Sequence, residues 1–144
     1  MESGVPASLL LPILLLALLA GCRDSGVEVD NRDPEMIAAI LKARDTVDEF
    51  IAALESPEPG QAFAVKARFR DGDADEYLWL GGVRFDGESF TGKVLNDPER
   101  VANVEQGDEH SVPLEQIADW AIVENGRRTG AFTDAVIRKR HARK

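Results

Sequence analysis

The chain has 144 residues and a formal net charge of −9, with 26 acidic residues against 17 basic ones. This length suits one domain, and 44% hydrophobic with 30% charged residues is a globular composition that excludes wholesale disorder. The single cysteine excludes an intramolecular disulfide framework and any multi-cysteine metal centre. The acidic balance argues against a dedicated nucleic-acid-binding protein, whose binding domain is basic.

The N-terminal region has the pattern expected of an export signal. Residues 9–20 are uncharged and apolar, too short for the roughly 20 residues of a membrane-spanning helix but typical of a secretory signal. The following Leu19-Ala20-Gly21-Cys22 resembles the lipobox of bacterial lipoproteins. In that family the chain is cleaved just before the cysteine, and the cysteine is acylated. The resemblance implies a signal peptide over residues 1–21, cleavage between Gly21 and Cys22, and a lipid on Cys22.

Two alternatives to the lipoprotein interpretation remain open. The segment before the apolar run has no Lys or Arg, which departs from the usual signal, and an ordinary signal peptide is one alternative. A buried N-terminal helix with an incidental cysteine is the other, although Pro6, Pro12 and Gly21 disfavour such a helix. We favour the lipoprotein, with a membrane partner through the lipid at Cys22 and a polar tether over residues 22–32. Arg23 is not the aspartate associated with inner-membrane retention, so we expect a cell-envelope location: the outer membrane, facing the periplasm, in a Gram-negative source.

A helix is predicted after the tether. Asp33-Pro34-Glu35 combines a capping aspartate, a proline at the first helical position and an acid in the first turn. Apolar residues then recur at three- and four-residue steps, namely Met36, Ile37, Ile40, Leu41, Val47, Phe50, Ile51 and Leu54. This spacing predicts an amphipathic helix whose apolar stripe faces the core, and Pro57 and Pro59 end it.

The remainder of the chain indicates short antiparallel strands. Residues 63–70 alternate between apolar side chains and a face that includes Lys66, Arg68 and Arg70. Further strands are predicted over 76–80, 83–85 and 90–95, with a bulge or bend at Gly81-Gly82. A short helix over 114–120 and a last hairpin over 121–133 complete the set. The fold class is therefore α+β, with the N-terminal helix packed on a small curled antiparallel sheet or open barrel.

The predicted domain covers residues 33–138, and a basic C-terminal tail covers 139–144. Residues 127–144 hold seven basic residues and one acid. We interpret Arg138-Lys139-Arg140-His141 as a solvated, frayed terminus. Contact with anionic lipid head groups is the alternative, since such surfaces attract basic side chains.

Motifs for catalysis and metal binding are not found. Neither histidine has a neighbour at metal-ligand spacing, and no nucleophile elbow or phosphate-binding loop is present. The sequence predicts no enzyme activity, no metal and no cofactor. Asp119-Trp120 places a carboxylate beside a large aromatic ring; we interpret it as a core tryptophan with an aspartate bonded to a turn.

Several segments in order resemble the YegJ-like bacterial family, a domain of unknown function numbered 2314. They are Val65-Lys66-x-x-Phe69, Glu76-Tyr77-Leu78-Trp79, Phe90-x-Gly92, Asn96-x-Pro98, Gly107-Asp108, Ile117-x-Asp119-Trp120 and Gly130-x-Phe132-Thr133. Ala121 stands where methionine is usual, and Ala131-Phe132 replaces a glycine–tyrosine pair. The resemblance implies a compact domain found among lipoproteins, without an assigned activity or catalytic residue.

Two hypotheses for function follow. The first is a non-enzymatic, monomeric envelope lipoprotein that binds an envelope protein through a surface comprising Lys66, Arg68, Arg70, Trp79, Asp119 and Trp120. The second is a small hydrolase or carbohydrate-binding protein that uses Asp119 and Glu76 beside Trp79 or Trp120, because aromatic rings flank paired carboxylates in carbohydrate clefts.

Overall fold

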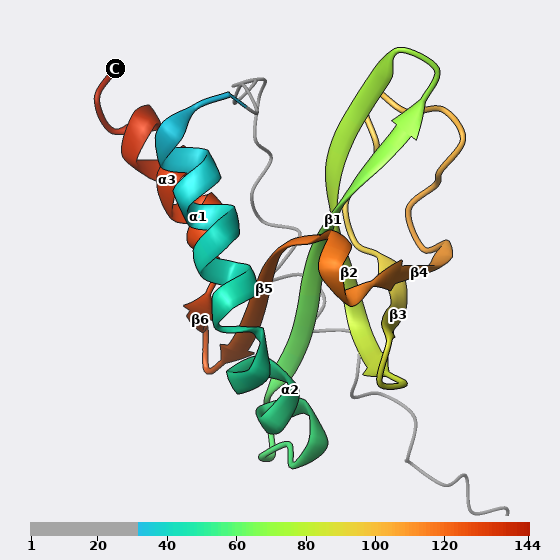
Figure 1. The fold of residues 1–144 in the computed structure, drawn as a ribbon, viewed down its shortest axis with the longest axis vertical. Coiled ribbons are helices and arrows are strands. Elements are labelled where there is room, and N and C mark those ends of the chain that lie inside the picture. Colours follow the sequence, from blue (N-terminus) through green and yellow to red (C-terminus); the bar gives the residue numbers. More distant parts are fainter. Residues whose placement is uncertain (1–31) are drawn as a thin grey trace, which may run out of the picture.

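The computed structural model describes residues 32–144, so Gly21, Cys22 and the predicted signal peptide lie outside the described residues (Figure 1). Its elements in chain order are α1 (Pro34–Asp45), α2 (Val47–Glu55), β1 (Ala62–Asp71), β2 (Ala74–Phe85), β3 (Ser89–Val94), β4 (Glu109–Pro113), the 3₁₀ turn η2 (Leu114–Gln116), β5 (Ile117–Glu124), β6 (Arg127–Gly130) and α3 (Phe132–His141).

The strands form one open sheet in the order β4-β3-β2-β1-β5-β6, and every neighbouring pair is antiparallel. Strands β1 to β4 form a meander, and the chain then crosses back so that β5 pairs with the other side of β1. The predicted α+β class with an open antiparallel sheet is confirmed. Strand β1 lies at the centre of the fold because both β2 and β5 pair with it.

The predicted helix start is confirmed, and the single helix is divided in two. The Asp33 side chain accepts a hydrogen bond from the Glu35 backbone N–H at 2.8 Å, as an N-cap does. Helix α1 ends at Asp45 because Thr46 leaves the helical conformation, and α2 starts at Val47. The Thr46 hydroxyl donates to the Lys42 carbonyl at 2.7 Å, a side-chain bond known to bend helices.

The buried face of α1 differs from the predicted stripe. Met36, Ala39 and Ala43 are buried, whereas Ile37 and Leu41 are 42% and 53% exposed. Helix α1 lies against β5, and the Trp120 ring N–H donates to the Ala43 carbonyl at 3.0 Å. The small side chains of Ala39 and Ala43 permit this close approach of α1 to β5.

Strands β1 and β3 agree with the sequence analysis, whereas the two strands predicted over 76–80 and 83–85 form one continuous strand, β2. Strand β1 pairs with β2 without interruption from Ala64–Gly81 to Asp71–Ala74. The register of β2 with β3 shifts between Gly81 and Arg84, which confirms the predicted bulge. Gly82 has a positive φ of 59°, the conformation that such a bulge requires of glycine.

The predictions for the C-terminal third need correction. Strand β4 was not predicted, the helix expected over 114–120 is reduced to η2, and Ile117–Trp120 belongs to strand β5. The last hairpin is β5–β6, and residues 132–141 form helix α3. Helix α3 crosses the predicted boundary between domain and tail.

Helices α1 and α3 lie side by side and antiparallel (Figure 1). At one end, Lys139 Nζ is 2.7 Å from Glu35 Oε1, and Arg140 pairs with Asp33. At the other, Lys42 Nζ lies 4.9 Å from the centre of the Phe132 ring. Residues 138–141 are therefore helical and not frayed, because α3 is paired with α1. Arg138, Lys139 and His141 are exposed, as expected of a solvated segment.

The main core lies between α1, α2 and the sheet. The Phe50 ring of α2 is fully buried and contacts Phe63, Phe90 and Trp120 at centroid distances of 5.5–5.8 Å. Among residues 32–144, no helix has both the length and the apolar character needed to span a bilayer.

Gly130 permits the close contact between β6 and β5. Its φ is +79°, and a Cβ atom there would lie 2.3 Å from the Trp120 carbonyl oxygen and 2.6 Å from its ring. We expect Gly130→Ala to lower the free energy of unfolding by about 3 kcal/mol, because backbone strain adds to overpacking. Gly126→Ala is the control, since Gly126 has a similar φ of +75° with open space around it. Urea denaturation giving equal losses for both variants would contradict this account of the packing.

Candidate functional site around Lys66 and Asp119

Strand register brings three of the predicted site residues into one row. In β1, Lys66 pairs with Trp79 of β2 on one side and with Asp119 of β5 on the other. Side chains of directly opposed residues project from the same face of a sheet. These three predicted site residues come from separate segments of the chain, and the fold places them next to one another.

The Lys66 side chain is buried in this row. Its exposed fraction is 6%, and its Nζ lies 4.8 Å from the centre of the Trp79 ring, a cation–π distance. The same Nζ donates to Thr133 Oγ1 at 3.0 Å and to Asp134 Oδ1 at 2.5 Å. The basic surface predicted for Lys66, Arg68 and Arg70 therefore lacks Lys66, because its charge is directed to the start of α3.

Asp119 is also buried, and its carboxylate holds the N-terminus of α3. Oδ1 accepts from the Phe132 N–H at 3.1 Å, and Oδ2 accepts from the Thr133 N–H at 2.8 Å and the Thr133 hydroxyl at 2.5 Å. The residue at the usual N-cap position, Ala131, has no side-chain oxygen and a left-handed φ of 51°. Asp119 thus supplies from β5 the cap that α3 lacks locally.

Burial governs the ionisation of this carboxyl group. Removal from water raises the pKa of Asp119 above its ordinary value, and the hydrogen bonds from Thr133, the charge of Lys66 and the Trp120 N–H act in the opposite direction. The charged form of Asp119 is therefore sustained by these donors and by Lys66. Loss of any one of them removes part of the compensation for this buried charge.

Thr133 joins the two charges. Its hydroxyl oxygen accepts from Lys66 Nζ, and its hydroxyl donates to Asp119. A hydroxyl between an amine and a carboxylate has the composition of a nucleophile with a base. Thr133 is only 2% exposed, however, and its proton is directed to a carboxylate that caps a helix. The arrangement connects α3 to the sheet.

The remaining predicted site residues lie elsewhere. Arg68 pairs with Asp75 across β1 and β2, and Arg70 is exposed further along β1. Trp120 is 2% exposed and projects from the other face into the main core against Phe50. The interpretation of Trp120 as a core residue is confirmed. For Asp119, the bonded partner is a helix start and not a turn.

The carboxylates of Glu76 and Asp119 do not share a cleft. Glu76 pairs with Phe69, three residues along β1 from Lys66, so the two carboxylates project from opposite faces of the sheet. The Glu76 carboxylate accepts the backbone N–H groups of Glu99 and Arg100 at 2.9–3.1 Å and so holds the loop after β3. The paired carboxylates expected for a glycosidase are therefore not formed by these two residues.

The partners that Lys66 and Asp119 have on α3 are not among the predicted site residues. Thr133 and Asp134 lie in the first turn of that helix, and Arg128 of β6 adds a contact to Asp134 at 3.3 Å. The segment Gly130-x-Phe132-Thr133 includes the start of α3, whereas its sequence predicts part of a hairpin.

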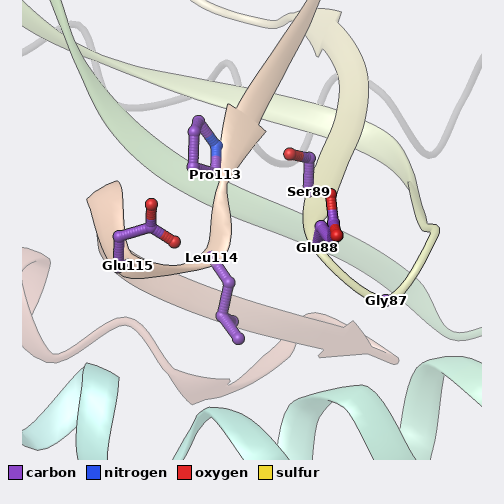
Figure 2. Close-up of a pocket in the computed structure, with 6 residues that line it drawn as sticks. All are labelled: Gly87, Glu88, Ser89, Pro113, Leu114 and Glu115. Carbon is purple, nitrogen blue, oxygen red and sulfur yellow. The ribbon is translucent and has the colours of Figure 1, made fainter.

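The described surface has a depression beside the 3₁₀ turn η2. A depression of about 440 Å³ lies between the start of β3 and the end of β4 and is lined by Gly87, Glu88, Ser89, Pro113, Leu114 and Glu115. Figure 2 shows the Leu114 side chain pointing away from Pro113 and Ser89, and Leu114 packs against the main core. Within residues 32–144, no group of three or more His, Cys, Asp or Glu side chains is arranged to hold a metal ion.

The fold and the Lys66–Asp119 cluster together define a small α+β domain with a polar cluster buried at the start of its last helix. A family model described as "Uncharacterized protein conserved in bacteria (DUF2314)" matches residues 33–144. The chain belongs to this bacterial family, and the resemblance to the YegJ-like domain of unknown function is confirmed.

Two relatives illustrate the family. The chain is 36% identical over 98 residues to the uncharacterized protein YegJ of Escherichia coli strain K12, an alignment that covers 68% of this chain and 63% of the relative. It is 40% identical over 68 residues to a putative ankyrin repeat protein of Neisseria meningitidis serogroup B, covering 47% of this chain and 27% of the relative. The chain spans less than two thirds of the length of each relative. No solved structure matches the chain.

Proposed function

We propose that the chain is a lipid-anchored, non-enzymatic binding domain of the bacterial cell envelope. The observation that carries the proposal is the segment Leu19-Ala20-Gly21-Cys22 directly after an apolar run of signal-peptide length. The sole cysteine of the chain stands at the position that the lipoprotein pathway modifies. The mature chain would begin at Cys22 and reach the domain through a polar tether that ends at residue 32.

The non-enzymatic part of the proposal is supported by the polar groups of the domain. Lys66, Asp119 and Thr133 are buried and bonded to one another, and Glu76 is bonded to a loop backbone. These groups stabilise the arrangement of helix, sheet and loop. A domain of this kind acts through its surface, and we propose a monomer that binds an envelope protein.

A candidate contact surface lies on β1. Arg68 and Arg70 are exposed there, while Lys66, which the sequence analysis included, is not. Arg68 is already paired with Asp75, so a partner would contact Arg70 and this ion pair at the sheet surface. An acidic segment of an envelope protein fits this surface. In a Gram-negative source, the domain would face the periplasm from the outer membrane.

Cys22→Ser is expected to abolish anchoring. Acylation requires the thiol, and several acyl chains give stable anchoring where one does not. The variant should therefore accumulate as an uncleaved precursor without palmitate label, whereas the wild-type chain takes up the label and partitions into detergent. Labelling with radioactive palmitate and detergent partition measure both effects.

A second variant tests whether acylation requires the lipobox as well as a thiol. Cys22→Ser combined with Ser25→Cys restores one cysteine three residues beyond the lipobox, and we expect it to remain unlabelled. Wild-type protein that takes up no label and leaves membranes in salt alone would contradict the anchor and favour an ordinary signal peptide.

A further inference from the structure

Charge is strongly segregated along this chain. Residues 127–144 hold seven basic residues and one acid, while residues 23–126 have a net charge of −14. Most of the basic residues lie in the last turn of α3 and directly after it. The domain therefore has one basic end on an otherwise acidic body.

Two ion pairs fix where this basic end lies. Lys139 with Glu35 and Arg140 with Asp33 hold the C-terminal end of α3 against the first turn of α1. Figure 1 shows the start of α1 and the end of α3 together at one corner of the molecule, with the loop after α2 at the opposite end. The first turn of α1 is also where the domain joins the segment that leads to Cys22.

The exposed cations that remain form what we call the basic corner, defined as Arg138, Arg143 and Lys144. All three are exposed, and no ion pair within 4 Å is formed by them among residues 32–144. The neighbouring carboxylates Asp33 and Glu35 are neutralised by Lys139 and Arg140. The corner thus presents net positive charge next to the point where the tether begins.

We propose that the basic corner binds the anionic head groups of the bilayer that holds the lipid anchor, and so orients the domain with this corner toward the membrane. The inference rests on the proposed anchoring at Cys22. It assigns to α3 a role in orientation that the lipidation signal alone does not imply.

Because the tether is short, a weak attraction between the basic corner and the bilayer is sufficient to orient the domain. The ten residues between Cys22 and Asp33 can extend to roughly 35 Å, so an anchored domain always stays near the surface. Near an anionic surface each basic side chain raises the equilibrium constant for contact about fivefold, and three together raise it about a hundredfold. The acidic body is repelled by the same surface, which strengthens the preference for one orientation.

The test uses an artificial anchor, so that its outcome does not depend on acylation in the cell. Residues 23–144 contain every described element, and a hexahistidine segment before Arg23 attaches this chain to vesicles with nickel-chelating lipid. A fluorophore is placed either at the basic corner through Ala142→Cys or at the far end through Glu58→Cys; both positions are exposed. Quenching by a head-group-labelled lipid then reports which end faces the bilayer.

We expect the label at position 142 to be quenched at least about threefold more than the label at 58 when phosphatidylglycerol is present. The difference should vanish when phosphatidylglycerol is replaced by phosphatidylcholine, in high salt, and in Arg138→Gln/Arg143→Gln/Lys144→Gln. Arg84→Gln/Lys93→Gln/Arg127→Gln removes the same charge from exposed positions elsewhere and should leave the difference in quenching unchanged. Equal quenching at both positions, or loss of the difference in both triple variants, would overturn the orienting role. The Cys22→Ser experiment would be unaffected by that result.

Discussion

Asp119→Ala is expected to lower the free energy of unfolding by about 4 kcal/mol, because buried donors lose their only strong acceptor and Lys66 loses a counter-charge. The Thr133 N–H and hydroxyl and the Phe132 N–H all donate to this carboxylate. Urea denaturation measures the global loss. Hydrogen exchange should in addition show α3 opening before the sheet, because the cap of this helix is removed.

Asp108→Ala is the matched control for this variant. Asp108 is exposed, and its carboxylate accepts one backbone N–H, from Glu105 at 2.9 Å, within a local turn. We expect a loss of about 1 kcal/mol or less there. If Asp119→Ala costs no more than Asp108→Ala, the long-range cap does not stabilise the domain.

Lys66→Met is expected to lower the free energy of unfolding by about 3–5 kcal/mol, the usual effect of removing one partner from a buried ion pair. Methionine keeps an unbranched side chain as far as Cε, so the loss mainly reports the charge and its two hydrogen bonds to Thr133 and Asp134. Removing Lys66 also removes a charge that lowers the pKa of Asp119. The Asp119 pKa then rises further, and a raised carboxyl pKa contributes stability at low pH that is lost as the pH increases.

The penalty of Lys66→Met should therefore be larger at neutral pH than in mild acid, which urea denaturation at several pH values can measure. Lys93→Met is the control, because Lys93 is an exposed lysine on β3 and surface substitutions change stability by about 0.5 kcal/mol or less. A penalty for Lys66→Met that equals the control, or that does not vary with pH, would show that Lys66 is not part of a buried charge cluster.

Several residues that carry the family resemblance stabilise the described structure. Asn96 Oδ1 accepts the Trp79 N–H at 2.7 Å, Glu76 holds the loop after β3, and Asp119 with Thr133 fixes α3. Gly130 allows β6 to pass the Trp120 ring. These residues define how loops and the last helix are attached to the sheet.

Features set by local sequence were predictable. Alternation in β1, the capping Asp33 and the bulge at Gly81-Gly82 each follow from a few neighbouring residues, and each is present. Helix α3 was missed for a physical reason: its cap is Asp119, more than ten residues earlier, and the local N-cap position is occupied by Ala131.

The position of Lys66 could not be predicted for a similar reason. In the sequence it stands on an alternating strand beside Arg68 and Arg70, a pattern typical of a solvated face. Only the return of the chain at α3 brings Thr133 and Asp134 to its Nζ and covers it. Strand β4 was missed because Glu109–Pro113 contains one buried apolar residue, Val112, and ends in proline.

The lipid anchor is tested most directly by intact-mass spectrometry of the protein extracted from bacterial membranes with detergent. The account predicts a chain that begins at Cys22 and carries the added mass of a diacylglycerol group and an amide-linked acyl group. A chain that retains residues before Cys22, or that begins at Cys22 or later without added mass, would contradict it.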